Sequence, residues 1–375
     1  MKVVEINPSD KRDRKRFLEL PFQIYASTPQ WVPPLEGDAR RMLDRHSHPF
    51  YAHSEAAFFL AIGSQPTQPV IGRLAVLNNR HYNEFNHEQT AFFYLFECQK
   101  DPEAAQGLFA AAGDWAQPQG LNRVYGPKGF TTLDGMGLLV KGFEHRPALG
   151  IPYNLPYYAS LLEAAGFSSV GDTVSGYLNP EFKFPEKVHQ VSKAVQEKRG
   201  LRIAIYNRRS DLNRLVPKLR DLYNASIEGT PGNTPLTQEE ARTMAEQLLW
   251  FADPRLIKIV MKDDDPVGFC FAYPDISAAL QRTRGQLFPF GWIDLLLELR
   301  RTKWININGA GMIEKYRGLG GTAILFSEMY KSVVDGRYQH ADIVQIGADN
   351  DRMQNEMRSF GIDFYKMHRM YAKNL

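Results

Sequence analysis

A glycine-rich turn between an apolar strand and an amphipathic helix carries the clearest chemical signal in this sequence. The segment before it, residues 304–308, alternates apolar and polar side chains as a half-buried strand does. The segment after it, residues 323–333, repeats apolar side chains at helical spacing. Such a turn offers backbone N–H groups and the positive end of a helix dipole, so it predicts a site for phosphate or pyrophosphate. The turn reads Tyr316-Arg317-Gly318-Leu319-Gly320-Gly321-Thr322.

The composition predicts a packed protein of two or three domains, because the chain has 375 residues. Its 45 Lys and Arg residues nearly balance 42 Asp and Glu residues, so a nucleic-acid partner is not expected. Hydrophobic residues make up 43% of the chain and are sufficient for packed cores. The two cysteines, Cys98 and Cys270, are expected to be buried thiols, and no metal site is expected. The histidines near residue 50 (His46, His48 and His53, with Glu55) match no zinc-ligand spacing.

The amino terminus shows no targeting pattern. The charged stretch at residues 10–16 is not followed by an apolar region, so a secretory signal is not expected. No run of about eighteen uncharged apolar residues occurs, so a membrane span is not expected either. The sequence therefore predicts a cytoplasmic protein, and it leaves the oligomeric state open.

A domain boundary is expected near residues 180–200. Two prolines, Pro180 and Pro185, interrupt the regular patterns there. A polar helix is expected from Glu186 to about Lys198, with Gly200 as its C-cap. The pattern predicts three parts: a first domain at residues 1–180, a linker helix at 181–200 and a second domain at 201–375.

Both halves close with the same order of elements. In the first half, Asn154 precedes a short helix that ends before Gly166, and a strand follows. In the second half, Asn350 precedes a short helix that ends before Gly361, and again a strand follows. Asn suits the N-cap of a helix and Gly suits the position after its last turn. The matched endings predict an internal duplication whose sequence has diverged.

With the strand, the turn and the final helix in place, the second half resembles a GNAT-type N-acyltransferase domain. That family carries an Arg/Gln-x-x-Gly-x-Gly/Ala loop that holds the pyrophosphate of coenzyme A. Arg317 and Gly320 match this loop, and Thr322 stands in place of its last Gly or Ala. The whole chain resembles a group of poorly characterised bacterial tandem-GNAT proteins, for example at residues 30–35 and 365–371. The resemblance implies an α/β (α+β) fold of two GNAT-like domains, each a mixed central sheet flanked by helices.

The resemblance also implies that the second half binds acetyl-CoA or another acyl-CoA as co-substrate. Backbone N–H groups of the turn would bind the pyrophosphate, and the helix dipole would add about 0.3–1 kcal/mol. Glycine is needed there because a Cβ would block the approach of the anion, whereas the Thr322 hydroxyl can donate a further hydrogen bond. Arg317 is expected to point to solvent and to contribute little to the loop.

Upstream of the turn, Gly309, Ala310 and Gly311 suit a bulge beside the pantetheine arm. A backbone N–H near Met312 or Ile313 would then polarise the thioester carbonyl. The expected coenzyme A-binding residues are Met312, Ile313, Arg317, Gly318, Leu319, Gly320, Gly321, Thr322 and Asn350.

The catalytic groups are harder to assign. Acyl transfer to an amine needs a base for the amine and a proton for the leaving thiolate. Many GNAT enzymes supply that proton from a Tyr on the last helix, but Met357 occupies the position here and cannot donate one. Tyr365 is the candidate catalytic residue in its place, with an ordinary strand tyrosine as the alternative. No base stands out among the charged residues that flank the strands, which are Asp294, Glu298, Glu314, His340 and Asp342.

The first half lacks the glycine-rich turn. At the corresponding place Asp101 and Glu103 open a helix, where carboxylates favour capping and disfavour phosphate. This half is expected not to hold coenzyme A but to pack against the second half and shape the acceptor site. Residues 125–130, Tyr153 and Asn154 are the candidates for that wall.

Three functions remain open on the sequence. The first is an acyl-CoA-dependent N-acyltransferase that transfers an acetyl group to an amine of a small molecule or peptide. The second is a non-catalytic acyl-CoA-binding or sensing protein of the same fold. The third is a tandem-GNAT transferase that uses aminoacyl-tRNA, although no added helical arm is apparent and the charge balance gives no support. A Rossmann nucleotide site would need its glycine loop early in a parallel βαβ unit. The acceptor and the acyl length are not specified.

Overall fold

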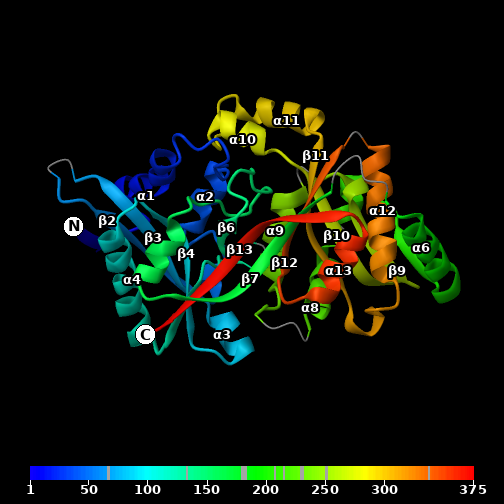
Figure 1. Ribbon diagram of the computed structural model, residues 1–375, viewed down its shortest axis with the longest axis horizontal. Helices are drawn as coiled ribbons and strands as arrows, with labels where there is room; N and C mark the ends of the chain where they lie inside the picture. Colours follow the sequence, from blue (N-terminus) through cyan, green and yellow to red (C-terminus); the bar gives the residue numbers. More distant parts are fainter. Residues whose placement is uncertain are drawn as a thin grey trace.

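The computed structural model folds into one continuous twisted sheet with helices on both faces (Figure 1). Within the described chain, no helix has both the length and the apolar character to cross a membrane. The structure describes residues 1–65, 68–131, 134–178, 184–206, 208–213, 216–228, 232–249, 252–336 and 338–375.

The first half supplies six strands up to residue 141, and β7 ends it. A parallel pair, β4 and β5, lies on the inner side of this half and is followed by a loop that runs toward the second half. Its elements are β1 (Lys2–Glu5), α1 (Lys11–Ile24), α2 (Glu36–Met42), β2 (Glu55–Ile62), β3 (Val70–Asn78), α3 (Arg80–Asn86), β4 (Thr90–Cys98), α4 (Pro102–Ala116), β5 (Arg123–Gly126), β6 (Leu138–Lys141), α5 (Tyr158–Ala164) and β7 (Ser168–Leu178), with short 3-10 turns at Pro49–Ala52 and Gln117–Gln119.

The second half begins with a helix and then repeats the strand pattern of the first. It adds two helices, α10 and α11, between its third and fourth strands. Its elements are α6 (Glu186–Arg199), β8 (Leu201–Ala204), α7 (Arg209–Asn213), α8 (Val216–Ser226), α9 (Gln238–Leu249), β9 (Ile257–Lys262), β10 (Asp265–Pro274), α10 (Ser277–Thr283), α11 (Gly291–Arg301), β11 (Trp304–Met312), α12 (Gly321–Asp335), β12 (His340–Gly347), α13 (Asp351–Ser359) and β13 (Ile362–Asn374), with 3-10 turns at Pro254–Leu256 and Glu314–Tyr316.

The strand order of the sheet is β1-β2-β3-β4-β5-β13-β7-β12-β11-β10-β9-β8, with β6 pairing to β13. The order β1 to β5 on one side is therefore mirrored by β8 to β12 on the other. In each half the fourth and fifth strands, β4 with β5 and β11 with β12, form a parallel pair. The matched order confirms the predicted duplication and the predicted fold class.

The last strands of the two halves lie together at the centre of the sheet. β13 comes from the end of the chain but pairs with β5 of the first half, and β7 pairs with β12 of the second half. β7 and β13 also pair with each other along most of their lengths. Each half therefore completes the sheet of the other. The predicted domain boundaries at residues 180 and 200 describe the order of the halves along the chain, and whether each half folds as a separate domain stays a prediction.

Alternating residues of the strands feed cores on opposite faces of the sheet. In the first half Phe59 packs with α4 on one face, and its neighbour Phe58 packs with Phe17 of α1 on the other. In the second half α12 packs on β9 and β10, and α6 packs beside α12. The helix α6 ends at Gly200, which adopts a left-handed conformation as a C-cap.

The two predicted Asn caps have different outcomes. Asn350 does cap α13, because its Oδ1 accepts a hydrogen bond from the Met353 N–H at 3.1 Å. The prediction that Asn154 caps α5 is wrong. The helix starts only at Tyr158, and the Asn154 amide is buried and hydrogen-bonded to the backbone of Leu139 in β6 instead. A buried side-chain amide satisfied by a strand backbone gains more than an exposed cap, which explains the difference.

Candidate functional site

The parallel strands β11 and β12 separate part-way along their length. Their pairing runs from Trp304 with His340 to Ile307 with Ile343 and then stops. Just beyond this point β11 carries a bulge, where Gly309 has φ +112°. A Cβ built on Gly311 would lie 2.7 Å from the Phe269 ring, so a small residue is required there as well. The separation leaves an open backbone edge on β11.

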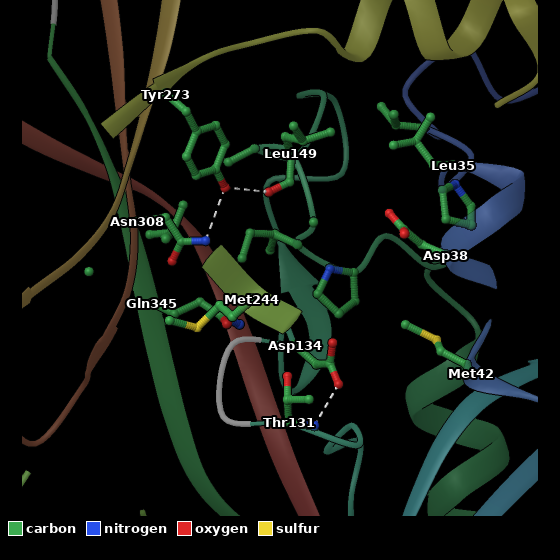
Figure 2. Close-up of a pocket in the computed structure, with 18 of the residues that line it drawn as sticks. Leu35, Asp38, Met42, Thr131, Asp134, Leu149, Met244, Tyr273, Asn308 and Gln345 are labelled. Carbon is green, nitrogen blue, oxygen red and sulfur yellow. Dashed lines mark hydrogen bonds between the residues drawn. The ribbon is translucent and has the colours of Figure 1, made fainter. Parts of the chain in front are cut away.

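A large cavity of about 1550 Å³ opens between the two halves and includes this separation. The drug-sized pockets of proteins hold about 300–1,000 Å³, so this cavity exceeds what a small ligand needs. Figure 2 shows side chains of both halves facing it, with Tyr273 and Asn308 on one wall and Leu35 and Met42 on the other. The open edge of β11 contributes Gly309, Ala310 and Gly311 to the lining.

The glycine-rich turn leads from β11 into α12; Gly311 before the turn and Phe326 after it line the cavity, whereas residues 316–322 are not among its lining residues. α12 begins at Gly321, and Gly320 before it has φ +88°, a conformation that favours glycine. Within the described residues, no side chain caps this helix start. A Cβ built on Gly320 would also lie 2.5 Å from Cγ2 of Val195 in α6, so a side chain at this position would both strain the backbone and displace Val195. Leu319 is partly buried, and Thr322 is the second residue of the helix.

Two arginines that the sequence reasoning missed lie against this turn. The Arg199 guanidinium of α6 donates to the Leu319 carbonyl at 3.1 Å. A Cβ built on Gly318 would lie 2.9 Å from Nη2 of Arg352 in the first turn of α13. Both are far from the turn in sequence, so only the packing of α6 and α13 brings them to it. They add positive charge beside the helix start, which favours an anion.

Arg317 does not simply point to solvent, as the sequence suggests. Its Nε donates to the Met312 carbonyl at 3.1 Å, and its Nη2 donates to the Ser226 carbonyl at 2.7 Å. The side chain therefore ties the end of α8 to the end of β11. Arg317 holds the shape of the turn rather than extending away from it.

The two predicted oxyanion donors, the backbone N–H groups of Met312 and Ile313, differ in whether they are already hydrogen-bonded to β10. The Ile313 N–H already donates to the Val267 carbonyl of β10 at 3.0 Å. Successive N–H groups of a strand point to opposite sides, so that of Met312 points away from β10 and toward the separation. The Met312 side chain packs against Gly268 and Gly321.

The predicted last-helix residues lie where the cavity meets α13. Asn350 and Met353 line the cavity, together with the fully buried Met357. The position at which many GNAT enzymes carry a proton-donating Tyr is therefore occupied by a thioether that faces the cavity.

Tyr365 lies in a buried polar network behind the cavity and is absent from the described lining residues. Its hydroxyl donates to Asp342 at 2.6 Å and accepts from the Lys366 ammonium at 2.6 Å. Burial and the adjacent Asp342 carboxylate raise the pKa of Tyr365. Burial also raises the pKa of Asp342 and lowers that of Lys366. A catalytic role of Tyr365 stays a prediction, and the structure gives its hydroxyl two strong partners.

Asp134, from a loop of the first half, is the carboxylate that the sequence reasoning missed. It faces the cavity (Figure 2), and its Oδ2 accepts from the Thr131 N–H at 2.8 Å. Burial raises the pKa of this carboxyl to about 6. Two residues on, the backbone of Met136 forms a pair of hydrogen bonds with the side-chain amide of Gln345 in β12. The loop is thereby fixed to the separated strands of the second half.

A metal centre has no evident place in the described chain, where no group of three or more His, Cys, Asp or Glu side chains is arranged to hold an ion. His53, one of the clustered histidines, instead lies 3.3 Å from Glu240 of α9. Burial lowers the pKa of His48 to about 4.

One sheet of two mirrored halves that exchange their last strands is the arrangement of the tandem GNAT fold. A tandem GNAT protein from the clavulanic acid biosynthesis pathway superimposes with a TM-score of 0.57 at 12% identity, over 100% of this chain and 98% of that one. A GCN5-related N-acetyltransferase from Sphaerobacter thermophilus superimposes with a TM-score of 0.50 at 14% identity, over 100% and 95% of the two chains. No family model matches the sequence.

Two curated proteins resemble the chain along nearly its whole length. Protein YghO of Escherichia coli (strain K12) is 26% identical over 375 residues, covering 98% of this chain and 94% of its own length. The bacterial ceramide synthase of Caulobacter vibrioides is 27% identical over 383 residues, covering 96% of this chain and 94% of its own.

Proposed function

We propose that this protein is an acyl-CoA-dependent N-acyltransferase whose second half binds the acyl-CoA and whose cavity admits the amine. One observation carries the proposal. The start of α12, which no described side chain caps, follows the open edge of β11, and this edge and the partly buried carboxylate of Asp134 line the same cavity. These are an anion cradle, a strand edge for the pantetheine arm and a base for the amine.

In this proposal the pyrophosphate binds the backbone N–H groups at the start of α12, between Gly318 and Thr322. Arg199 and Arg352 supply positive charge from the two neighbouring helices. The pantetheine arm runs along the open edge of β11, where its amides can pair with the backbone of residues 309–311. The Met312 N–H then lies at the end of this edge and is the donor for the thioester oxygen.

The chemistry is a direct transfer. The amine nitrogen attacks the thioester carbonyl, a C–N bond forms, the C–S bond breaks, and the amine proton passes to the Asp134 carboxylate. An ordinary thiol has a pKa of about 8.5, so a coenzyme A thiolate can leave and take its proton from water. The reaction therefore does not require a proton-donating side chain at the position of Met357, so a methionine there is compatible with turnover. Tyr365 remains a possible donor only if its hydrogen bonds to Asp342 and Lys366 rearrange.

The size and lining of the cavity favour a long hydrocarbon chain on the acyl group, on the amine or on both. A small molecule or peptide that receives an acetyl group, as the sequence suggests, would leave most of the 1550 Å³ empty. Apolar side chains such as Leu35, Met42, Leu149 and Met244 line it. The full-length relative described as a bacterial ceramide synthase supports a lipid amine as acceptor.

The test measures binding and turnover with acyl-CoAs of increasing chain length against short and long-chain amines. Long-chain pairs should give the highest kcat/KM, and Gly320→Glu should abolish acyl-CoA binding because the side chain meets Val195 and its charge repels phosphate. Gly171→Glu is the matched control, since a Cβ there meets nothing within 4 Å. If the purified protein bound no acyl-CoA of any length in calorimetry, the proposal would be wrong.

A second candidate keeps the binding site without the chemistry. The buried Met357 and the paired hydroxyl of Tyr365 are the observations that favour an acyl-CoA-sensing protein. Tight acyl-CoA binding without release of coenzyme A, across both short and long-chain amines, would support that function instead.

A further inference from the structure

The two helices inserted between β10 and β11 carry an exposed apolar surface. In Figure 1, α10 and α11 lie together at the top of the molecule, outside the sheet. The turn before α11 and one face of α11 expose large apolar side chains, by 38% for Leu297 up to 80% for Phe288. We call this surface the apolar ridge; it consists of Phe288, Phe290, Trp292, Ile293, Leu296 and Leu297.

The core of the protein does not account for the ridge. α11 buries Leu295 against Ile276, Ala279 and Leu280 of α10 and its preceding turn, and this contact uses its inner face. The ridge lies on the other side of the same helix. A soluble protein rarely gathers six large apolar side chains in one exposed patch unless the patch contacts something.

The turn that presents the two phenylalanines is well ordered by hydrogen bonds. The Trp292 N–H donates to the Leu287 carbonyl at 2.9 Å, and the Ile293 N–H donates to the Phe290 carbonyl at 3.0 Å. The Trp292 indole N–H donates to the Pro289 carbonyl at 3.2 Å. The exposed rings are therefore held in place rather than left on a loose loop.

The charges around the ridge complement an anionic surface. Both carboxylates of α11, Asp294 and Glu298, are paired with Arg282, at 2.9 Å and 2.5 Å. The helix ends in Arg300 and Arg301, and Lys303 follows; all three are exposed. Aromatic and aliphatic side chains flanked by arginine and lysine are the pattern of helices that lie in a bilayer interface.

The inserted segment also forms part of the cavity wall. Leu280, Gln286 and Leu287 line the cavity, and they come from the same segment as the ridge. Gln281 donates to the carbonyls of Pro29 and Trp31, so the segment bridges to the first half. Leu287 of the cavity wall directly precedes Phe288 of the ridge in the chain, so the ridge is continuous with the wall.

We propose that the apolar ridge docks on the surface of an anionic phospholipid bilayer, with α11 lying in the interface. Docking itself does not depend on the proposed function; only the delivery of a lipid substrate into the cavity rests on it. The complementary charge and the continuity with the cavity favour a bilayer over a second copy of this chain.

The test is co-sedimentation of the full chain with vesicles of phosphatidylcholine mixed with phosphatidylglycerol, compared with pure phosphatidylcholine. The protein should bind the mixed vesicles and release at high salt. The combined substitution Phe288→Ser, Phe290→Ser and Trp292→Ser should weaken binding by about tenfold or more. Arg300→Gln with Arg301→Gln should remove the preference for the anionic lipid. Phe85→Ser, on a side chain 52% exposed on α3, is the matched control and should bind as the wild type does.

Three outcomes overturn this inference. The first is the absence of mixed-vesicle binding in the wild type, and the second is mixed-vesicle binding that the triple variant retains. The third is a wild-type dimer in analytical ultracentrifugation that the triple variant loses, which would assign the ridge to a second copy of this chain. Turnover of a water-soluble, short-chain amine should be unchanged in the triple variant. If the triple variant loses vesicle binding but keeps this turnover, the ridge serves docking and not catalysis. If the wild type itself shows no turnover, the proposed function fails while docking can still be tested.

Discussion

The two halves of this protein start their corresponding helices in opposite ways. α12 of the second half follows β11 and begins after Gly320, without a side-chain cap from any described residue. α4 of the first half follows β4 and begins after Asp101, whose Oδ1 accepts from the Ala104 N–H at 3.1 Å. The start of α12 therefore keeps its N–H groups without a side-chain acceptor among the described residues, whereas the Asp101 carboxylate accepts from the Ala104 N–H at the start of α4.

The strands that lead into these helices differ in the same sense. The pairing of Gly72 with Cys98 matches that of Gly268 with Met312, which makes Glu97 the counterpart of Gly311. Glu97 is buried, and it accepts hydrogen bonds from Tyr25 at 2.5 Å and Tyr158 at 2.7 Å. At the position where β11 of the second half has a glycine and an unpaired backbone edge, β4 of the first half has a buried carboxylate with hydrogen-bond partners. In the proposed function the second half therefore binds acyl-CoA, whereas the corresponding strand and helix start of the first half are stabilised by their own side chains.

The largest expected effect concerns a residue that crosses this division. Asp134 belongs to the first half but faces the cavity beside the separated strands of the second. As general base it should contribute about 10²–10⁴-fold to kcat, so Asp134→Asn should lower kcat by that factor with little change in acyl-CoA affinity. The raised pKa means that the carboxylate is mostly protonated below about pH 6 and ionised above it. The wild-type rate should therefore rise with pH through about 6, and the variant should lose this limb of the profile.

A pH–rate profile at saturating acyl-CoA, with calorimetry of acyl-CoA binding alongside, measures both effects. An Asp134→Asn variant with wild-type kcat would show that Asp134 is not the base. The first half would then contribute packing, and no catalytic group from Asp134, to the reaction of the second half.

The next effect tests the stabilising role of the first half. Glu97→Ala leaves the Tyr25 and Tyr158 hydroxyls without this acceptor and removes the carboxylate that lies 3.8 Å from the buried Arg73. Removing one partner of a buried ionic group costs about 3–5 kcal/mol. The free energy of unfolding in urea should fall by about that amount, and Glu97→Gln, which keeps an acceptor oxygen, should lose clearly less. Equal losses in the two variants would mean that the negative charge of Glu97 beside Arg73, rather than its acceptor oxygen or its packing, carries the stabilisation.

The sequence predicts the parts of this comparison that are local. Strand alternation, the glycines of the turn and the acidic start of α4 are adjacent in sequence, so the cradle and its absence in the first half can both be anticipated. Arg199, Arg352 and Asp134 cannot, because α6, α13 and a loop of the other half bring them to the site through long-range packing. The prediction that Asn154 caps a helix is wrong for a similar reason, because its amide is hydrogen-bonded to the backbone of β6. The crossing of β7 and β13 has no local signal at all.

A smaller effect concerns the charges at the open helix start. Arg352→Ala removes a guanidinium next to Gly318, and acyl-CoA affinity should fall about tenfold, or about 1.4 kcal/mol. The loss should shrink as salt is added, because the group is exposed and its charge is screened. Arg358→Ala on the same helix, with its guanidinium over the Phe364 ring, is the control and should bind acyl-CoA normally. Equal losses in the two variants would point to a general effect on α13 instead of a contact with phosphate.

The smallest expected effect comes from removing the side-chain cap of α4, which leaves its helix start uncapped like that of α12. Asp101→Ala removes the cap of α4 and should lower the free energy of unfolding by about 1 kcal/mol, as loss of an N-cap typically does. It should not create a second acyl-CoA site, because Leu95, Phe96 and Glu97 still occupy the strand where the second half has Gly309, Ala310 and Gly311. Calorimetry should therefore give one binding site in both proteins. A second site in the variant would mean that the cap alone keeps the first half closed, and that the strand residues beside it matter little.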